Sequence, residues 1–239
     1  MAAVEQMLLN LRPRPDARLT DFAAPAWAAL VAALEAFLDT PGGLFYFRGE
    51  PGVGRSHLLS ALCGEAEQRG MTALQLPLAE LKDEEPSLLQ GLEGVGLVAC
   101  DDLEAVAGRP DWEEGLFHFI NRSRAAGARL LFSAAGAPGD CGFHLPDLVS
   151  RLAQAPCWTL ALPDDASREL LLKAAACRHD LVLEADVLRY LTGRGPRETG
   201  RLLALVSELD RLSLVAGRRL TIPFVRQVLE REGLSGQSP

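Results

Sequence analysis

The sequence lacks the excess of positive charge that is typical of proteins that bind nucleic acids or membrane surfaces. Its 24 Lys and Arg residues stand against 32 Asp and Glu residues, which gives a formal net charge of −8. Most of the acidic excess lies before residue 164. Because polyanions bind mainly through clustered positive charge, we expect no generic affinity for DNA, RNA or anionic lipid.

Cysteine is scarce and widely spaced. The chain has five cysteines and no C-x-x-C pair. We therefore expect reduced, mostly buried thiols of a cytosolic protein, and neither a disulfide framework nor a zinc site.

Long apolar runs are also absent. The longest, APAWAALVAALEAFL, is interrupted by Glu35 and is too short to cross a bilayer. The N-terminal stretch MAAVEQMLLNLRPRP has neither a basic start nor a small-residue cleavage site. These features predict a cytoplasmic protein without a membrane span.

Three segments follow from the hydrophobic pattern. Residues 1–18 resemble a flexible arm, and residues 19–163 alternate apolar strands with helices, which predicts an α/β domain with a doubly wound parallel sheet. Residues 164–239 read as helix after helix, a small all-α domain. The strands are predicted at 44–48, 72–76, 96–102, 128–134 and 158–162; the helices at 25–38, 57–69, after residue 76 through 92, 112–124, 164–179, 184–193, 196–216 and 222–232.

The stretch GEPGVGRSH, residues 49–57, has the glycine spacing of a phosphate-binding loop. Glycines let backbone N–H groups surround phosphate oxygens, and the helix that follows adds the positive end of its dipole. A glycine-rich turn of this kind can also serve packing alone. The nucleotide-binding residues that this segment predicts are Pro51, Gly52, Val53, Gly54, Arg55, Ser56 and His57.

A second acidic strand strengthens the nucleotide hypothesis. The apolar run 96–100 ends in Asp101 and Asp102, where folds of this class place the carboxylate that holds Mg²⁺. Ser56 and Asp101 are the candidate Mg²⁺ ligands, if the ion is present. Paired aspartates also cap helices and begin turns, so that alternative stays open.

Arg55 stands where such loops nearly always have lysine. Its planar, forked guanidinium can neutralise phosphate but should disturb the geometry of γ-phosphoryl transfer. Asp102 occupies the position of a water-orienting glutamate and reaches one methylene less far. We expect weak or no intrinsic ATPase activity.

The segments GEPGVGRSHLL, LVACDDLE, LPDLVSRL, GPRETGRLL and LTIPFV resemble the AAA+ module of the DnaA family, and more closely its Hda branch, which lacks the DNA-binding domain. The resemblance covers residues 6–232. It implies an AAA+ P-loop NTPase domain followed by a helical lid, with ADP or ATP as the ligand. Arginine in the phosphate loop is typical of this branch.

The resemblance also implies partners. Within the arm, Gln6, Met7, Leu9 and Leu11 resemble the peptide that docks into the sliding clamp, the β subunit of DNA polymerase III. Without the resemblance, these residues read as an ordinary terminal tail. DnaA itself is the second implied partner, and AAA+ modules commonly form homodimers or larger homo-oligomers.

Two arginines match functional positions of the family. Arg151 matches the arginine finger that reaches a neighbour's nucleotide, and Arg197 matches the lid arginine that contacts the nucleotide of its own subunit. Arg151 could equally be an ordinary surface arginine, and Arg197 could form a salt bridge with Glu198 or another acid. Base selectivity is expected near residues 20–22.

One departure from the family concerns the strand after the acidic one. DnaA-like sequences carry a polar group at its end, whereas this chain has Ser133-Ala134-Ala135. Since Ala135 cannot form a side-chain hydrogen bond, hydrolysis of the chain's own nucleotide is further disfavoured.

The resemblance implies a negative regulator of replication initiation, ADP-bound and associated with the clamp, which supplies Arg151 in trans to DnaA-bound ATP. An autonomous AAA+ ATPase of the helicase-loader or initiator type is the alternative. A sequence-specific DNA-binding initiator would need a basic helix-turn-helix domain after the lid, which this sequence does not contain.

Overall fold

The computed structural model describes residues 17–216 and 219–231 and divides the chain into two compact units. The first contains Ala29–Pro51 and Arg55–Ala161. The second contains everything from Leu162 onward, together with two short pieces from earlier in the chain, Thr20–Ala28 and Gly52–Gly54.

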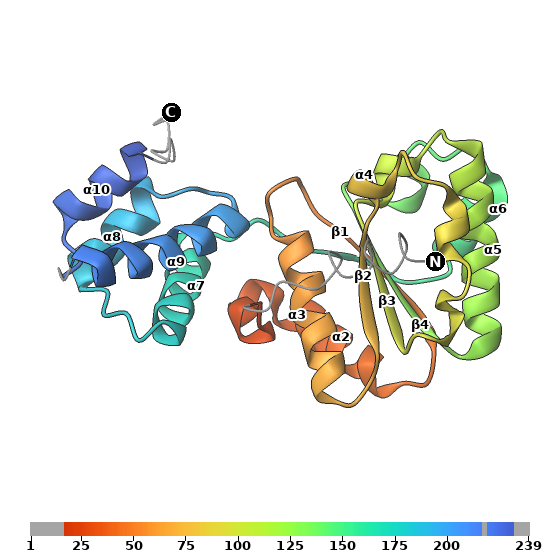
Figure 1. Cartoon of the computed structure of the whole chain (residues 1–239), viewed down its shortest axis with the longest axis horizontal. Coiled ribbons are helices and arrows are strands. Elements are labelled where there is room, and N and C mark those ends of the chain that lie inside the picture. The colour runs from red at the N-terminus through yellow and green to blue at the C-terminus, as the bar shows by residue number, and fades with distance from the viewer. Residues whose placement is uncertain (1–16, 217–218, 232–239) are drawn as a thin grey trace. The chain divides into compact units, whose positions relative to one another are not determined.

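A five-stranded parallel sheet forms the centre of the first unit (Figure 1). The strands lie in the order β2-β3-β4-β1-β5. Their bounds are β1 Gly43–Arg48, β2 Ala73–Pro77, β3 Leu97–Asp101, β4 Arg129–Ala134 and β5 Cys157–Thr159.

Helices cover both faces of this sheet, as the alternating pattern predicts (Figure 1). In the figure α2 and α3 lie on one side, and α4, α5 and α6 on the other. The helices are α2 Ala28–Asp39, α3 Arg55–Gln68, α4 Leu78–Leu81, α5 Pro110–Ala126 and α6 Pro146–Leu152.

Alternation along β1 shows how the two faces are filled. The ring of Phe45 packs against Phe37 of α2, with ring centroids 5.4 Å apart. Tyr46, the next residue, points to the opposite face and joins the core beneath α5 and α6 with Trp112 and Phe119. Successive strand residues face opposite sides, so one strand serves both cores.

The predicted helix that extends to residue 92 is wrong. After β2 the structure has only α4, followed by short 3-10 turns at Pro86–Leu89 and Leu92–Gly94. Glu85, the residue before Pro86, is extended, with φ −79° and ψ 136°. A proline disfavours helical geometry at the residue before it, which explains the break.

The second unit is helical. Its helices are α7 Asp165–Arg178, α8 Ala185–Arg194, α9 Thr199–Ala216 and α10 Ile222–Arg231. The buried side chain of Arg168 on α7 donates hydrogen bonds to the carbonyls of Gly195 (3.1 Å) and Pro196 (3.0 Å), which ties α7 to the turn between α8 and α9. A Cβ on Gly195 would lie 2.5 Å from the carbonyl oxygen of Leu191, so this turn requires glycine.

An early segment of the chain packs within the helical unit. In Thr20–Ala28, the rings of Phe22 and Trp27 meet edge to face with centroids 5.2 Å apart. The buried carboxylate of Asp21 forms an ion pair with Arg178 at the end of α7. Residues far apart in the sequence thus belong to one compact unit.

None of the helices among the described residues combines the length and hydropathy needed to span a lipid bilayer.

The end of α5 offers a test of local backbone geometry. Gly127 has φ +74°, its N–H bonds to the carbonyls of the last helical turn, and a Cβ there would meet no neighbour. Gly127→Ala should therefore lower the free energy of unfolding by roughly 1–2 kcal/mol through left-handed backbone strain alone. Urea unfolding followed by circular dichroism measures the change.

Gly139→Ala is the matched control, because Gly139 also has open space around it but no positive φ. Equal losses in the two variants would contradict the strain argument.

Candidate functional site

The phosphate-type loop lies between the end of β1 and the start of α3. Gly52 and Gly54 have φ values of +82° and +109°, which L side chains rarely adopt. Val53, between them, is fully buried and anchors the loop. Backbone N–H groups in such a turn, with a helix beginning directly after it, suit an anion.

This loop fits closely against the start of α9 within the second unit. The N–H of Thr199 donates to the carbonyl of Gly52 at 2.9 Å. A Cβ on Gly52 would lie 2.5 Å from Glu198, and one on Gly54 would lie 3.1 Å from Thr199. Both the backbone conformation and the available space therefore require glycine.

Arg55, the first residue of α3, is buried and bridges two carboxylates. Its Nη2 donates to Oδ1 of Asp102 at 2.6 Å, and its Nη1 donates to Oε1 of Glu104 at 2.9 Å. The forked guanidinium makes both bonds at once, which the single ammonium centre of lysine does less well. Sequence reasoning anticipated Arg55 and Asp102 in one site but missed Glu104, although it follows Asp102 by only two residues.

The two aspartates at the end of β3 have different environments. Asp101 is buried, and its Oδ1 accepts a hydrogen bond from Ser133 Oγ on β4 at 2.5 Å and from the N–H of Asp102 at 3.1 Å. Asp102 adopts a left-handed conformation with φ 52°, an uncommon one that turns the chain out of the strand.

The pKa of Asp102 is raised to about 6. Burial is the main cause, the negative charge of Asp101 adds to it, and the Arg55 guanidinium opposes it. Ala135 lies exposed just past the end of β4 and contributes only a methyl group. The carboxylate of Asp102 is thus engaged by Arg55 and has no polar neighbour in the side chain of Ala135.

Residues Ser56 and His57 lie in the first turn of α3. His57 is buried, and the carbonyl of Ser56 accepts hydrogen bonds from Ser60 Oγ (3.0 Å) and Gln75 Nε2 (3.3 Å). Pro51, at the tip of the loop, is exposed. Within residues 17–216 and 219–231, no group of three or more His, Cys, Asp or Glu residues could by itself hold a metal ion.

The buried hydroxyl of Thr199 is a second feature that suits a polar ligand at the glycine loop. Its Oγ1 has no hydrogen-bond partner among the described residues, and it lies beside the phosphate-type loop, 3.6 Å from where a Cβ on Gly54 would be. Buried hydroxyls are normally satisfied, so an orphan at a glycine loop is consistent with a polar ligand nearby.

Arg151 lies in the last turn of α6, in the first unit. Leu148 and Leu152, on the same short helix, are fully buried in the core, whereas Arg151 is half-buried. Its guanidinium makes no hydrogen bond or ion pair with any described residue. The side chain is therefore available to an external partner.

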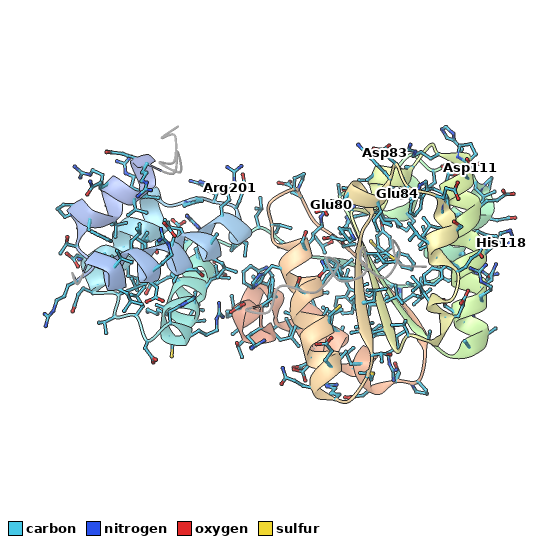
Figure 2. All side chains as sticks on the ribbon, in the orientation of Figure 1. Glu80, Asp83, Glu84, Asp111, His118 and Arg201 are labelled. Carbon is cyan, nitrogen blue, oxygen red and sulfur yellow. The ribbon has the colours of Figure 1, made fainter. Side chains whose placement is uncertain are left out.

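Arg197 lies in the turn between α8 and α9, in the second unit, and is exposed. The alternative pairing with Glu198 is not found, because Glu198 pairs with Arg201 at 2.9 Å. Figure 2 labels Arg201 at the surface of this unit. The turn itself is held by Arg168.

The clamp-type residues Gln6, Met7, Leu9 and Leu11 lie outside the described residues, so their assignment stays a prediction.

Acidic side chains dominate the surface around α4 and the start of α5. Glu80, Asp83, Glu84 and Asp111 are exposed there, as Figure 2 shows. This surface would repel a phosphate backbone, in line with the expectation from composition.

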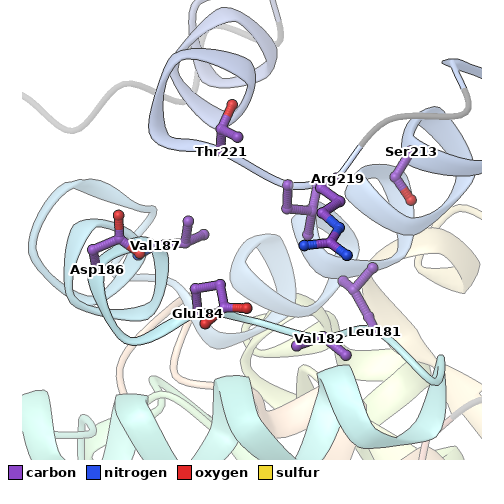
Figure 3. A pocket seen from close by; sticks show the side chains of 9 residues that line it. Leu181, Val182, Glu184, Asp186, Val187, Ser213, Arg219 and Thr221 are labelled. Carbon is purple, nitrogen blue, oxygen red and sulfur yellow. The ribbon is translucent and has the colours of Figure 1, made fainter.

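A cavity of about 500 Å³ lies in the second unit (Figure 3). Leu181, Val182 and Val187 contribute apolar surface, and Glu184 and Arg219 face it from different segments. None of the residues predicted for the nucleotide site lines it.

Arg55→Lys tests the bridge. Lysine cannot hold Asp102 and Glu104 together as the fork does, so the free energy of unfolding should fall by roughly 1–3 kcal/mol. Arg109→Lys is the matched control, because Arg109 pairs only with the exposed Asp83 and the change should stay within about 0.5 kcal/mol. Chemical unfolding measures the free energy of unfolding of both variants. Equal losses in the two would contradict a structural role for the forked guanidinium of Arg55.

Comparison with known proteins identifies the type of fold. Residues 164–229, which span α7 to α9 and most of α10, match a family model described as "Hda, lid domain". Domain III of the Thermotoga maritima replication initiation protein DnaA has a TM-score of 0.78 at 18% identity, over 91% of this chain and 97% of that one.

Two further solved structures share the fold. AMPPCP-bound DnaA from Aquifex aeolicus has a TM-score of 0.71 at 20% identity, covering 92% of this chain and 69% of that chain. The Thermotoga maritima RuvB Holliday junction branch migration motor has a TM-score of 0.61 at 18% identity, covering 86% and 68%. The chain therefore has the fold of DnaA domain III, and its residues 164–229 match the Hda lid-domain model.

Proposed function

We propose that this chain binds an adenine nucleotide, ADP, as a structural ligand. Gly52 to Ser56 would surround its phosphates, Arg197 would approach from the lid, and Ser56 and Asp101 would hold Mg²⁺ with the phosphates where the ion is bound. The positive φ values of the loop and the orphaned hydroxyl of Thr199 support this assignment. The likeness to AMPPCP-bound DnaA supports an adenine base.

Turnover of this nucleotide would be weak. Arg55 engages Asp102 at 2.6 Å, which holds that carboxylate away from an attacking water. Ala135 adds no group that could sense a γ-phosphate. An autonomous ATPase is the alternative, and rapid ATP turnover by the purified chain alone would favour it.

The function that the site supports best is activation of hydrolysis in a partner. Arg151 is the residue on which this proposal rests, because its side chain is only half-buried and makes no hydrogen bond or ion pair within the described chain. Inserted beside ATP bound to DnaA, it would stabilise negative charge on the γ-phosphoryl oxygens as water attacks phosphorus and ADP departs. The Hda-type lid supports this role over that of an initiator.

Regulation follows from that chemistry. Hydrolysis would convert DnaA to its ADP form and suppress a second initiation, so the chain would inhibit DNA replication. Residues 6–11 would tether it to the sliding clamp on DNA, and a homodimer would bury Arg151 until DnaA displaces the second copy. Sequence-specific DNA binding has no part in this scheme.

Arg151→Ala should reduce the stimulated hydrolysis of DnaA-bound ATP by roughly three to five powers of ten relative to the wild-type chain, in the presence of clamp-loaded DNA. Release of phosphate from radiolabelled ATP on DnaA measures the rate. Arg122→Ala, which removes an exposed arginine paired with Glu93, should leave the rate unchanged. Full stimulation by Arg151→Ala would remove the finger assignment.

Deleting residues 1–12 should abolish capture of the chain by immobilised clamp. Leu9→Ala should weaken binding roughly tenfold or more, since a buried leucine contributes roughly 1.5–3 kcal/mol. Asn10→Ala is the control, because Asn10 is not among the anchoring residues. Undiminished binding by the deletion variant would place clamp contact elsewhere on the chain.

A further inference from the structure

We infer that Glu113 is the positioning residue for Arg151, an inference that rests on the proposed function. Glu113 lies in the first turn of α5 and is 1% exposed. A buried carboxylate is costly unless hydrogen bonds satisfy it. Every hydrogen bond that its side chain accepts comes from backbone N–H groups.

These hydrogen bonds join two segments that are distant in sequence. Oε1 accepts from the N–H of Gly108 at 2.8 Å, immediately ahead of α5. Oε2 accepts from the N–H groups of His144 (2.9 Å) and Leu145 (2.6 Å), immediately ahead of α6. One side chain thereby links the start of α5 to the start of α6.

The start of α6 depends on this external carboxylate. Leu145, the residue just before the helix, has no side-chain acceptor, and Pro146, the first helical residue, has no N–H. Glu113 supplies the negative charge that the N-terminal end of a helix favours. Glu113 thus accepts the N–H groups at the start of α6 from another helix, as the side chain of a capping aspartate would do from the N-cap position itself.

Further contacts hold the segment between β4 and α6. The hydroxyl of Tyr46 on β1 donates to the carbonyl of Gly136 at 2.7 Å and lies 3.4 Å from Sγ of Cys141. Leu148 and Leu152 fix the rotation of α6 through the core. Glu113 is the polar side chain that holds the backbone just ahead of the helix that carries Arg151.

Arg151 depends on its helix for position, because its guanidinium makes no hydrogen bond or ion pair with any described residue. A shift at Leu145 would carry through the two turns of α6 to the guanidinium. Displacement of a charge-stabilising group by about 1 Å can lower a rate by roughly a hundredfold. Glu113 therefore acts on the reaction through Arg151 and touches no nucleotide itself.

Glu113→Gln tests this with little change of shape. The amide keeps one oxygen acceptor, but its NH₂ group faces backbone N–H donors that it cannot satisfy. We expect the maximal rate of DnaA-bound ATP hydrolysis to fall at least about tenfold, with the concentration of the chain for half-maximal stimulation unchanged within about twofold. Nucleotide binding by the chain itself should not change.

Two variants complete the design. Trp112→Phe removes the neighbouring hydrogen bond from Trp112 Nε1 to the carbonyl of Lys82, on the α4 side, and should leave stimulation intact. In an Arg151→Ala background, Glu113→Gln should cause no further loss, because both act through one group. An additive loss would overturn the inference.

Hydrogen exchange on the wild-type chain provides a readout without substitution. The amides of His144 and Leu145 should exchange as slowly as those of the core strands, and fast exchange would overturn the inference even if Glu113→Gln fails to fold. Wild-type stimulation by Glu113→Gln, together with loss in Arg151→Ala, would overturn the inference and leave the proposed function standing. Wild-type stimulation by Arg151→Ala would instead overturn the proposed function, and the inference with it.

Discussion

The parallel register of β1, β3 and β4 is the constraint on which the candidate site depends. Arg48 pairs with Ala134, and Cys100 pairs with Phe132, so the three strands end at one edge of the sheet. Parallel strands place their carboxyl ends together, and ligands of open α/β sheets bind outside those ends. Arg55 and Asp102, and likewise Asp101 and Ser133, form hydrogen bonds there because the strands carry them to the same edge.

At that edge, Arg55 forms an ionic cluster with Asp102 and Glu104. Removing a carboxylate would leave the buried guanidinium of Arg55 with less compensation, so we expect the bridge to the partly exposed Asp102 and Glu104 to stabilise this edge. In the proposed function, the same contact keeps Asp102 from orienting an attacking water. The chain has only two lysines, Lys82 and Lys173, and neither lies in the loop. The positive φ values of the loop suit a phosphate, and in the proposed function its side chains disfavour hydrolysis.

Two other buried charged side chains, Glu113 and Arg168, form hydrogen bonds with backbone groups. In each case the segment they hold carries an arginine that has no partner among the described residues. Glu113 receives N–H groups ahead of α6, which bears Arg151. Arg168 donates to carbonyls of the turn that bears Arg197. Both arginines are free of partners among the described residues, whereas the backbone beneath them is tightly held. Such preorganisation suits a group that stabilises charge on a nucleotide.

By itself the sequence determined the alternation of strands and helices, the helical region after residue 163, the glycine loop and the acidic end of β3. These depend on local patterns that span a few residues. It did not determine the break after α4, where Pro86 overrode an apolar periodicity, nor the grouping of Thr20–Ala28 with the helical unit. The sequence pattern also could not predict the hydrogen bonds of Glu104 and Glu113, because a glutamate on a helical pattern is expected to be exposed to solvent. Only the tertiary structure brings these carboxylates to their distant donors: Arg55 lies 49 residues from Glu104, and the N–H groups of His144 and Leu145 lie 31 and 32 residues from Glu113.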